Sequence, residues 1–273
     1  MNFVETLHAA LDGPEAFWLA ITNLGSDFGF IALLSLYLWL VNPRGGRQVG
    51  VFFGASVLLT DALKYALNEP RPFFTDPNVA SEAAQKTAGG PGLPSGHALV
   101  STTVWGLAAA QLRSRAFWWV ASAVVLLIAL SRVVLGVHFL TDVLAGLVLG
   151  ALLVLIGSRL TLPRRDFIVP LVAVVAAAFL PALATGLGIF AGFWLSRPDF
   201  DAPRTWVNRL VFVVVGFVLV FAVYFTFRVI PENLRHGGLV SALRYVALVL
   251  TATDLVPWLL RRLTPGGART ATA

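Results

Sequence analysis

The chain of 273 residues is 58% hydrophobic and only 12% charged, with a mean hydropathy of +0.81. Soluble globular proteins carry about 25% charged residues, so this composition excludes an ordinary soluble domain and indicates a polytopic membrane protein. The chain has no cysteine, which excludes disulfides, iron–sulfur clusters and thiolate zinc sites. The net charge of +6 reflects arginines in short loops, as membrane topology requires, and we expect no nucleic-acid partner.

The segment 2–24 predicts one or two short helices, interrupted at Gly13 and Pro14, that lie at the membrane interface. It has neither a basic region nor a small-residue cleavage site, so we expect no removable signal peptide. Apolar runs then predict eight spans, at residues 27–41, 49–67, 97–112, 117–130, 139–156, 167–187, 207–229 and 239–260. We therefore expect an all-α transmembrane bundle, divided into interfacial helices (1–24), a six-span core (25–187) and further spans with a tail (188–273).

Basic residues in alternate loops predict the orientation of the bundle. They fall on one side, which should be cytoplasmic: Arg44, Arg47, Arg113, Arg115, Arg159, Arg164 and Arg165. The long loop 68–96 and the stretch 131–142 then lie on the outer face. Eight spans would also place Arg261, Arg262 and Arg269 outside. Either this basic C-terminal tail is tolerated on the outer face, or the segment 239–260 does not cross the membrane.

The costly polar residues stand at the ends of consecutive spans. Lys64 and Arg71 follow the second span, Ser95, Gly96 and His97 open the third, Ser131 and Arg132 end the fourth, and His138 and Asp142 open the fifth. Consecutive spans run in opposite directions, so all these groups meet at one membrane edge. The topology predicts a single site on the outer face.

The residue types in this set are suited to bind phosphate. Lys64, Arg71 and Arg132 are three cations at an apolar edge, and guanidinium groups match phosphate oxygens bidentately. Ser95 and Gly96 open a helix whose free N–H groups also attract anions.

Two histidines supply the groups that phosphoryl transfer requires. His138 and Asp142 are four residues apart, so on a helix they share a face, and the carboxylate would fix the imidazole tautomer for attack. His97 is then the proton donor. Two alternatives stand beside this interpretation: Asp61 and Lys64 form an intrahelical ion pair, or the histidines and Asp142 bind a metal. The three cations disfavour the metal.

Three sequence segments together resemble a known family. Lys64-x6-Arg71-Pro72, Pro94-Ser95-Gly96-His97 and Ser131-Arg132-x5-His138-x3-Asp142 are similar to the three-part signature of the type 2 phosphatidic acid phosphatase superfamily. The resemblance covers about residues 25–187, and the last span resembles an extended bacterial subgroup. It implies that His138 forms a phosphohistidine, Asp142 holds it and His97 protonates the leaving group. It further implies phosphate binding by Lys64, Arg71, Ser95, Gly96 and Arg132, without a metal ion or other cofactor.

We therefore expect a lipid phosphatase of the bacterial inner membrane, with its site on the outer face. Its partners would be membrane lipids and a lipid phosphate: polyprenyl diphosphate, phosphatidate, phosphatidylglycerol phosphate or a long-chain base phosphate. The sequence leaves the substrate and the oligomeric state open. A phosphotransferase that passes the phosphoryl group to another acceptor is an alternative, as is a non-catalytic lipid-phosphate binder or transporter. The spans disfavour the family's soluble haloperoxidase branch.

Overall fold

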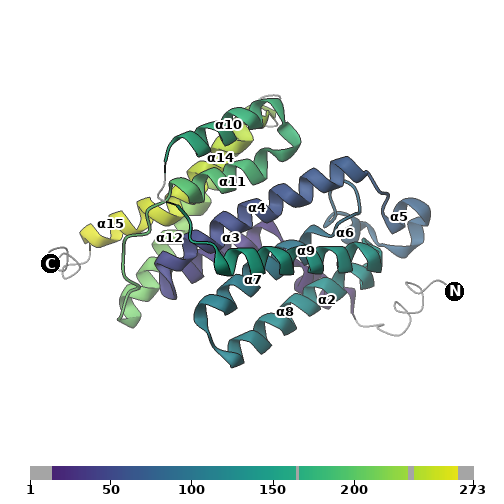
Figure 1. Cartoon of the computed structure of the whole chain (residues 1–273), viewed down its shortest axis with the longest axis horizontal. Coiled ribbons are helices and arrows are strands. Elements are labelled where there is room, and N and C mark those ends of the chain that lie inside the picture. The colour runs from purple at the N-terminus through teal and green to yellow at the C-terminus, as the bar shows by residue number, and fades with distance from the viewer. Residues whose placement is uncertain (1–13, 164–165, 233–236, 264–273) are drawn as a thin grey trace. The chain divides into compact units, whose positions relative to one another are not determined.

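A computed structural model describes residues 14–163, 166–232 and 237–263, and these ranges contain helices but no strand. The expected all-α bundle is confirmed (Figure 1). Two compact units are present: the described residues up to Phe30 with Ala55–Thr161, and Ile31–Gly54 with the described residues from Leu162 onward. These units are defined by contacts, and the expected division after residues 24 and 187 stays a prediction. Arg164, Arg165, Arg269 and residues 2–13 of the predicted N-terminal helices lie outside the described residues.

The first unit holds α2 (Glu15–Asn23), α5 (Pro72–Thr75), α6 (Glu82–Gln85), α7 (Gly96–Leu112), α8 (Arg115–Val134) and α9 (Leu140–Arg159). The second holds α10 (Ile168–Phe179), α11 (Ala184–Leu195), α12 (Trp206–Thr226), α14 (Gly238–Leu250) and α15 (Val256–Leu263), with a π-helical turn at Thr251–Leu255. Each unit contains part of α3 (Asp27–Leu40) and part of α4 (Pro43–Leu67).

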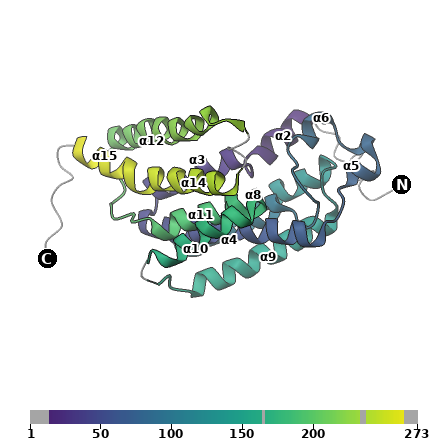
Figure 2. The same cartoon turned by 90° about the horizontal axis from the view of Figure 1, so that it is seen from above.

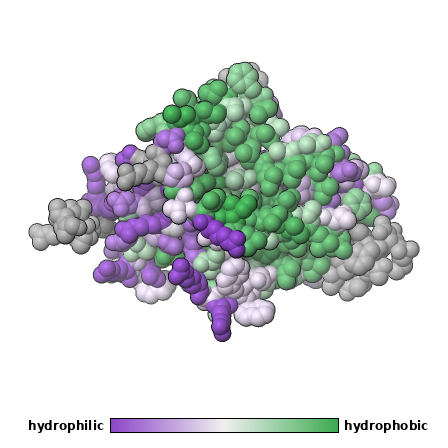
Figure 3. Space-filling model, viewed as in Figure 1, coloured by the Kyte–Doolittle hydropathy of each residue, from purple (hydrophilic) through white to green (hydrophobic). Residues whose placement is uncertain are grey.

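Among the residues that the structure describes, five stretches are long and apolar enough to cross a membrane, judged by length and composition, and a sixth is added if the bent pair α2 and α3 is one span. The five are Pro43–Thr75, Arg115–Val134, Leu140–Arg159, Trp206–Thr226 and Gly238–Arg262. Eight spans were expected. The difference arises partly because α3 has only 14 residues and α7 only 17. Exposed apolar side chains cover α9 in the first unit and α10 in the second, as a lipid-facing surface requires (Figure 3).

The single span expected at 167–187 is wrong. The structure has two helices of 12 residues there, α10 and α11, separated by a turn at Pro181–Leu183. Pro181 has no backbone N–H, and it disfavours the helical conformation at Leu180, whose ψ is 67°. Each helix rises only about 18 Å, too little to cross about 30 Å of hydrocarbon. Instead α10, α11 and α14 pack together (Figure 2).

Two glycines allow α9 to approach α7 closely in the first unit. A Cβ atom on Gly146 would lie 2.6 Å from the carbonyl oxygen of Ser95, and one on Gly150 would lie 2.7 Å from that of Leu99. No larger residue fits at these distances without moving a helix. This close crossing places the beginning of α7 beside the beginning of α9, where the predicted site residues lie.

Candidate active site

The predicted site residues meet within the first unit, as the alternation of spans predicted. Six of the eight residues are buried: Lys64, Arg71, Ser95, Arg132, His138 and Asp142. Gly96 and His97 are half-buried at the beginning of α7. The charges of Arg71, Arg132 and Lys64 act on the imidazoles of both His138 and His97. The structure therefore brings together every residue that the sequence assigned to the site.

The loop before α7 supplies neutral oxygen acceptors to the cations. Arg71 donates from Nε to Gly90 O (2.8 Å) and from Nη2 to Gly89 O (2.7 Å). Lys64 Nζ donates to Pro91 O at 2.5 Å. These backbone oxygens satisfy hydrogen bonds, but they carry no net charge to balance the cations.

Within residues 14–163, none of the three cations forms an ion pair with a carboxylate. The alternative pairing of Asp61 with Lys64 is therefore absent, since Lys64 reaches carbonyl groups instead. Buried charges are costly unless they are paired. Among the described residues of the first unit, three buried cations face one buried carboxylate, that of Asp142, and this excess of positive charge suits a phosphate anion.

The neighbours of His138 determine its tautomer. Its Nδ1 lies 3.1 Å from Asp142 Oδ2, and its Nε2 lies 2.9 Å from Arg71 Nη1. A guanidinium group can only donate and an ionised carboxylate can only accept. Nδ1 therefore carries the proton, and Nε2 presents its lone pair.

The electrostatic surroundings keep this imidazole neutral. Burial, reinforced by Arg71, Arg132 and Lys64, holds the pKa of His138 well below its usual range. His138, in the loop between α8 and α9, therefore holds a neutral imidazole whose Nε2 lone pair accepts a hydrogen bond from Arg71. Such a group is able to act as a nucleophile.

The contact between His138 and Asp142 was expected, but its local cause differs from the expected one. His138 lies before α9, so the two residues do not share a helical face. Asp142 is the third residue of α9, and its Oδ2 also accepts from the backbone N–H of Phe139 at 3.0 Å. The carboxylate therefore caps the helix and holds His138 at once.

The turn before His138 depends on a glycine. Gly136 has a φ of +66°, and a Cβ atom there would lie 1.9 Å from Val79 O. Only glycine adopts this conformation readily. The turn lets Arg132, at the end of α8, and His138 reach the same site.

Ser95 provides a free hydroxyl group at the beginning of α7. Its side chain is buried and does not cap the helix, and its Oγ has no hydrogen-bond partner among the described residues. Buried polar atoms are rarely left unsatisfied. A hydroxyl beside a helix N-terminus is suited to donate to a phosphate oxygen.

Two further residues contact the site, and the sequence analysis missed both. Thr22 in α2 and Thr87 in the loop accept hydrogen bonds from Nη1 of Arg132. Neither belongs to a motif, and threonine is common in loops and helices. Only a tertiary structure could reveal this contact. In the described part of the chain, no group of three or more histidine and acidic side chains is arranged as metal ligands are.

Comparison with known protein families gives two matches. Residues 45–166 match the PAP2 superfamily, and residues 180–269 match the transmembrane extension of PAP2 superfamily phosphatases. The first match contains all eight predicted site residues. The second covers most of the segment after the six predicted core spans.

Three curated relatives illustrate the range of similar proteins. Undecaprenyl-diphosphatase of Sulfolobus acidocaldarius is 30% identical over 52% of this chain and 67% of its own length. Phosphatidylglycerophosphatase B of Bacillus subtilis is 33% identical over 49% of this chain and 68% of its own. Human glucose-6-phosphatase 3 is 29% identical over 70% of this chain and 59% of its own. No solved structure matches the chain.

Proposed function

The chain belongs to the PAP2 superfamily, and from this premise we propose that it is an integral-membrane phosphatase of lipid phosphate or diphosphate esters. The observation that carries the proposal is the buried His138, which has the carboxylate of Asp142 at Nδ1 and the guanidinium of Arg71 at Nε2. The matched relatives that act on lipid phosphates, together with the apolar spans, favour a lipid substrate.

In the first step, His138 Nε2 attacks phosphorus. A P–N bond forms while the P–O bond to the leaving group breaks. The leaving group is the lipid alcohol for a monophosphate and the lipid monophosphate for a diphosphate, and protonated His97 gives its proton to the leaving oxygen. The phosphate anion beside His97 favours its protonated form. Lys64, Arg71 and Arg132 stabilise the charge on the phosphoryl oxygens, with Ser95 and the Gly96 backbone as further donors.

In the second step, water attacks the phosphohistidine. His97 accepts a proton from the water, the P–N bond breaks, and inorganic phosphate leaves with His138 neutral again. Asp142 retains its hydrogen bond to Nδ1 throughout and stabilises the positive charge on the phosphorylated ring. Because Lys64, Arg71 and Arg132 stabilise the charge on the phosphoryl oxygens, neither step requires a metal ion.

A substrate panel in detergent tests the proposal. Wild type and His138→Ala would be assayed on a polyprenyl diphosphate, phosphatidate, phosphatidylglycerol phosphate, a long-chain base phosphate and glucose 6-phosphate. Inorganic phosphate and the dephosphorylated product are both measured. We expect equal amounts of the two from wild type on a lipid substrate, and none from His138→Ala.

Other outcomes separate the alternatives. Dephosphorylated lipid in excess of free phosphate would indicate a phosphotransferase. Binding of a lipid phosphate without turnover would indicate a binder or transporter. Rapid quenching with radiolabelled substrate should trap label on wild type and none on His138→Ala. Activity that is lost with EDTA and restored by a divalent cation would contradict metal independence.

A further inference from the structure

The guanidinium group of Arg132 is held by two threonines that lie outside the three sequence motifs. Its Nη1 donates to Thr22 Oγ1 at 2.5 Å and to Thr87 Oγ1 at 3.0 Å, and its Nη2 donates to Thr87 O at 3.1 Å. Arg132 and Thr22 are both completely buried. The threonine oxygens are neutral, so they orient the guanidinium without neutralising it.

These contacts leave one edge of the guanidinium available. Nε of Arg132 is buried and has no hydrogen-bond partner in the described part of the chain. A guanidinium has five N–H donors, and the edge formed by Nε and Nη2 is one of those that can bind phosphate bidentately. Thr22 and Thr87 take both N–H groups of Nη1 and one of Nη2, so Nε and the second N–H of Nη2 form the edge left to bind an anion. If the Arg132 guanidinium rotated, the edge occupied by the threonines would face the anion in place of the free Nε edge.

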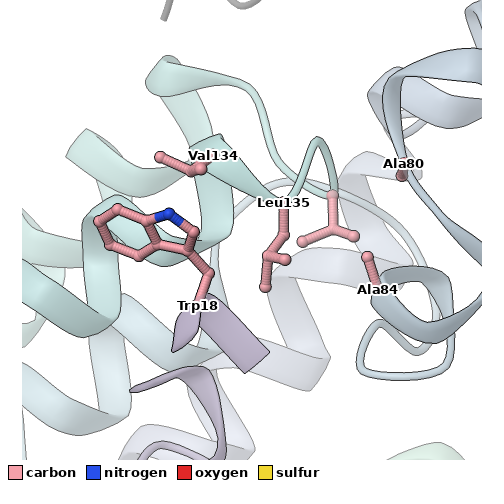
Figure 4. Close-up of a cluster of buried hydrophobic side chains, with 6 residues drawn as sticks. Trp18, Ala80, Ala84, Val134 and Leu135 are labelled. Carbon is pink, nitrogen blue, oxygen red and sulfur yellow. The ribbon is translucent and has the colours of Figure 1, made fainter. Parts of the chain in front are cut away.

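The helix that carries Thr22 is anchored to the same region by other contacts. Trp18 of α2 packs in a cluster with Ala80, Ala84, Val134 and Leu135, which joins α2 to the end of α8 and to the loop around α6 (Figure 4). The hydroxyl of Ser81 also donates to the Glu15 carboxylate. Thr22 is therefore fixed on a short helix that α8 and the loop both contact.

The residues that follow α2 contact a second predicted catalytic residue. A Cβ atom on Gly25 would lie 2.9 Å from Cδ2 of His97. Thr22 and Gly25, three residues apart, therefore lie against Arg132 and His97 respectively. Both precede the part of the chain that matches the PAP2 superfamily, which begins at residue 45.

We propose that Thr22 is a positioning residue for phosphoryl transfer, because it holds the Arg132 guanidinium with its Nε edge toward the phosphate. This inference rests on the proposed function, since Arg132 must bind the phosphoryl group. The segment before the family region thereby completes the phosphate site.

Three variants isolate the Thr22 hydroxyl. Thr22→Val keeps the shape and removes the hydroxyl, and Thr22→Ser restores it. Thr103→Val is the matched control, because Thr103 is also completely buried in the same unit but donates only to Leu99 O, at 2.9 Å. Hydrogen bonds to charged groups are strong enough that their loss changes an equilibrium roughly tenfold or more. We therefore expect roughly tenfold lower kcat/KM and roughly tenfold weaker competitive inhibition by inorganic phosphate for Thr22→Val.

We expect Thr22→Ser and Thr103→Val to resemble wild type in kcat/KM and in phosphate inhibition. Thr22→Val should remain folded, with an unfolding temperature lowered by no more than the loss of one buried hydrogen bond explains. In an Arg132→Lys background, removing the Thr22 hydroxyl should change kcat/KM less than about twofold, because the group it orients is gone. If Thr22 only stabilised the fold, the losses of kcat/KM from Thr22→Val and Arg132→Lys would be additive. Should Thr22→Val not fold, Thr22→Cys replaces it, with a smaller loss expected because a thiol is a weaker acceptor.

Several results would overturn the inference: wild-type kinetics in Thr22→Val, an equal loss in Thr103→Val, or full additivity with Arg132→Lys. Thermal unfolding with and without inorganic phosphate distinguishes a failure of the inference about Thr22 from a failure of the proposed phosphatase function. If wild type is stabilised by phosphate but hydrolyses nothing, the proposed function fails and the phosphate shift of Thr22→Val alone decides the inference. If wild type neither hydrolyses lipid phosphates nor is stabilised by phosphate, both proposals fail.

Discussion

Nε2 of His138 lies 2.9 Å from Nη1 of Arg71, so the lone pair of the proposed nucleophile accepts a hydrogen bond from a buried cation. For Nε2 to attack phosphorus, Nη1 must release it and turn to a phosphoryl oxygen. The same guanidinium therefore restrains the imidazole before the substrate binds and neutralises charge afterwards. Arg71 also lowers the pKa of His138, after the larger effect of burial.

This relationship predicts how the pH dependence changes when the Arg71 charge is removed. A lowered pKa keeps His138 neutral below the usual imidazole value of about 6.5, so the acidic limb of kcat/KM should lie below that pH in wild type. Arg71→Gln removes a positive charge, raises the pKa of His138 and should move the limb to higher pH. It should also lower kcat/KM on the order of 10²-fold or more.

Arg71→Lys is the control for this experiment. It keeps the positive charge and loses the guanidinium fork, so we expect a reduced rate with the acidic limb near that of wild type. Phosphate esters themselves titrate with a second pKa of about 6, but this contribution is common to all three proteins. If the acidic limb of kcat/KM lies at the same pH in Arg71→Gln and wild type, Arg71 does not lower the pKa of His138.

Asp142→Asn should separate catalysis from folding. The asparagine oxygen can still accept the Phe139 N–H that caps α9, so the unfolding temperature should stay near that of wild type. The amide no longer fixes the His138 tautomer, and kcat should fall on the order of 10²–10⁴-fold. Asp142→Ala should lose activity as well and about 1 kcal/mol of stability with the cap. Wild-type kcat in Asp142→Asn would remove Asp142 from the mechanism.

The sequence predicted the gathering of the eight site residues because only the alternating direction of spans was needed for it. It could not predict the contacts of Thr22 with Arg132, since these depend on how α2 packs against α8. It placed the break at Pro181 inside a span, because hydropathy averages over a window and does not register one missing N–H. The His138–Asp142 contact was predicted from helical spacing, and a helix cap produced it.

Gly136→Ala should disrupt the turn that joins Arg132 to His138. A positive φ costs a non-glycine residue about 1–3 kcal/mol, and the added Cβ would also overlap Val79 O. We expect a lower unfolding temperature and lower activity. Gly89→Ala is the control, because a Cβ there meets nothing within 4 Å. Equal stability of the two variants would show that the Gly136 turn adapts.

The absence of native cysteine allows a direct test of the orientation that the basic loops predict. Gly89 in the loop beside the site and Arg115 at the opposite end of α8 are both exposed. A membrane-impermeant maleimide applied to intact cells should label Gly89→Cys and leave Arg115→Cys unlabelled until the membrane is permeabilised. The reverse pattern would place the site on the cytoplasmic face.

His97 as proton donor predicts a dependence on the leaving group. A lipid alcohol leaves as a strongly basic alkoxide unless it is protonated, so His97→Ala should lower kcat/KM on lipid phosphates by on the order of 10²–10⁴-fold. An ester of an acidic phenol leaves without a proton, so its first step should be much less affected. Phosphohistidine should then accumulate in His97→Ala, because the second step also lacks its base.

His138→Ala serves as the control and should fail with both esters. An equal loss on the two esters in His97→Ala, measured by the initial burst of released phenol or alcohol, would assign the leaving-group proton to another residue.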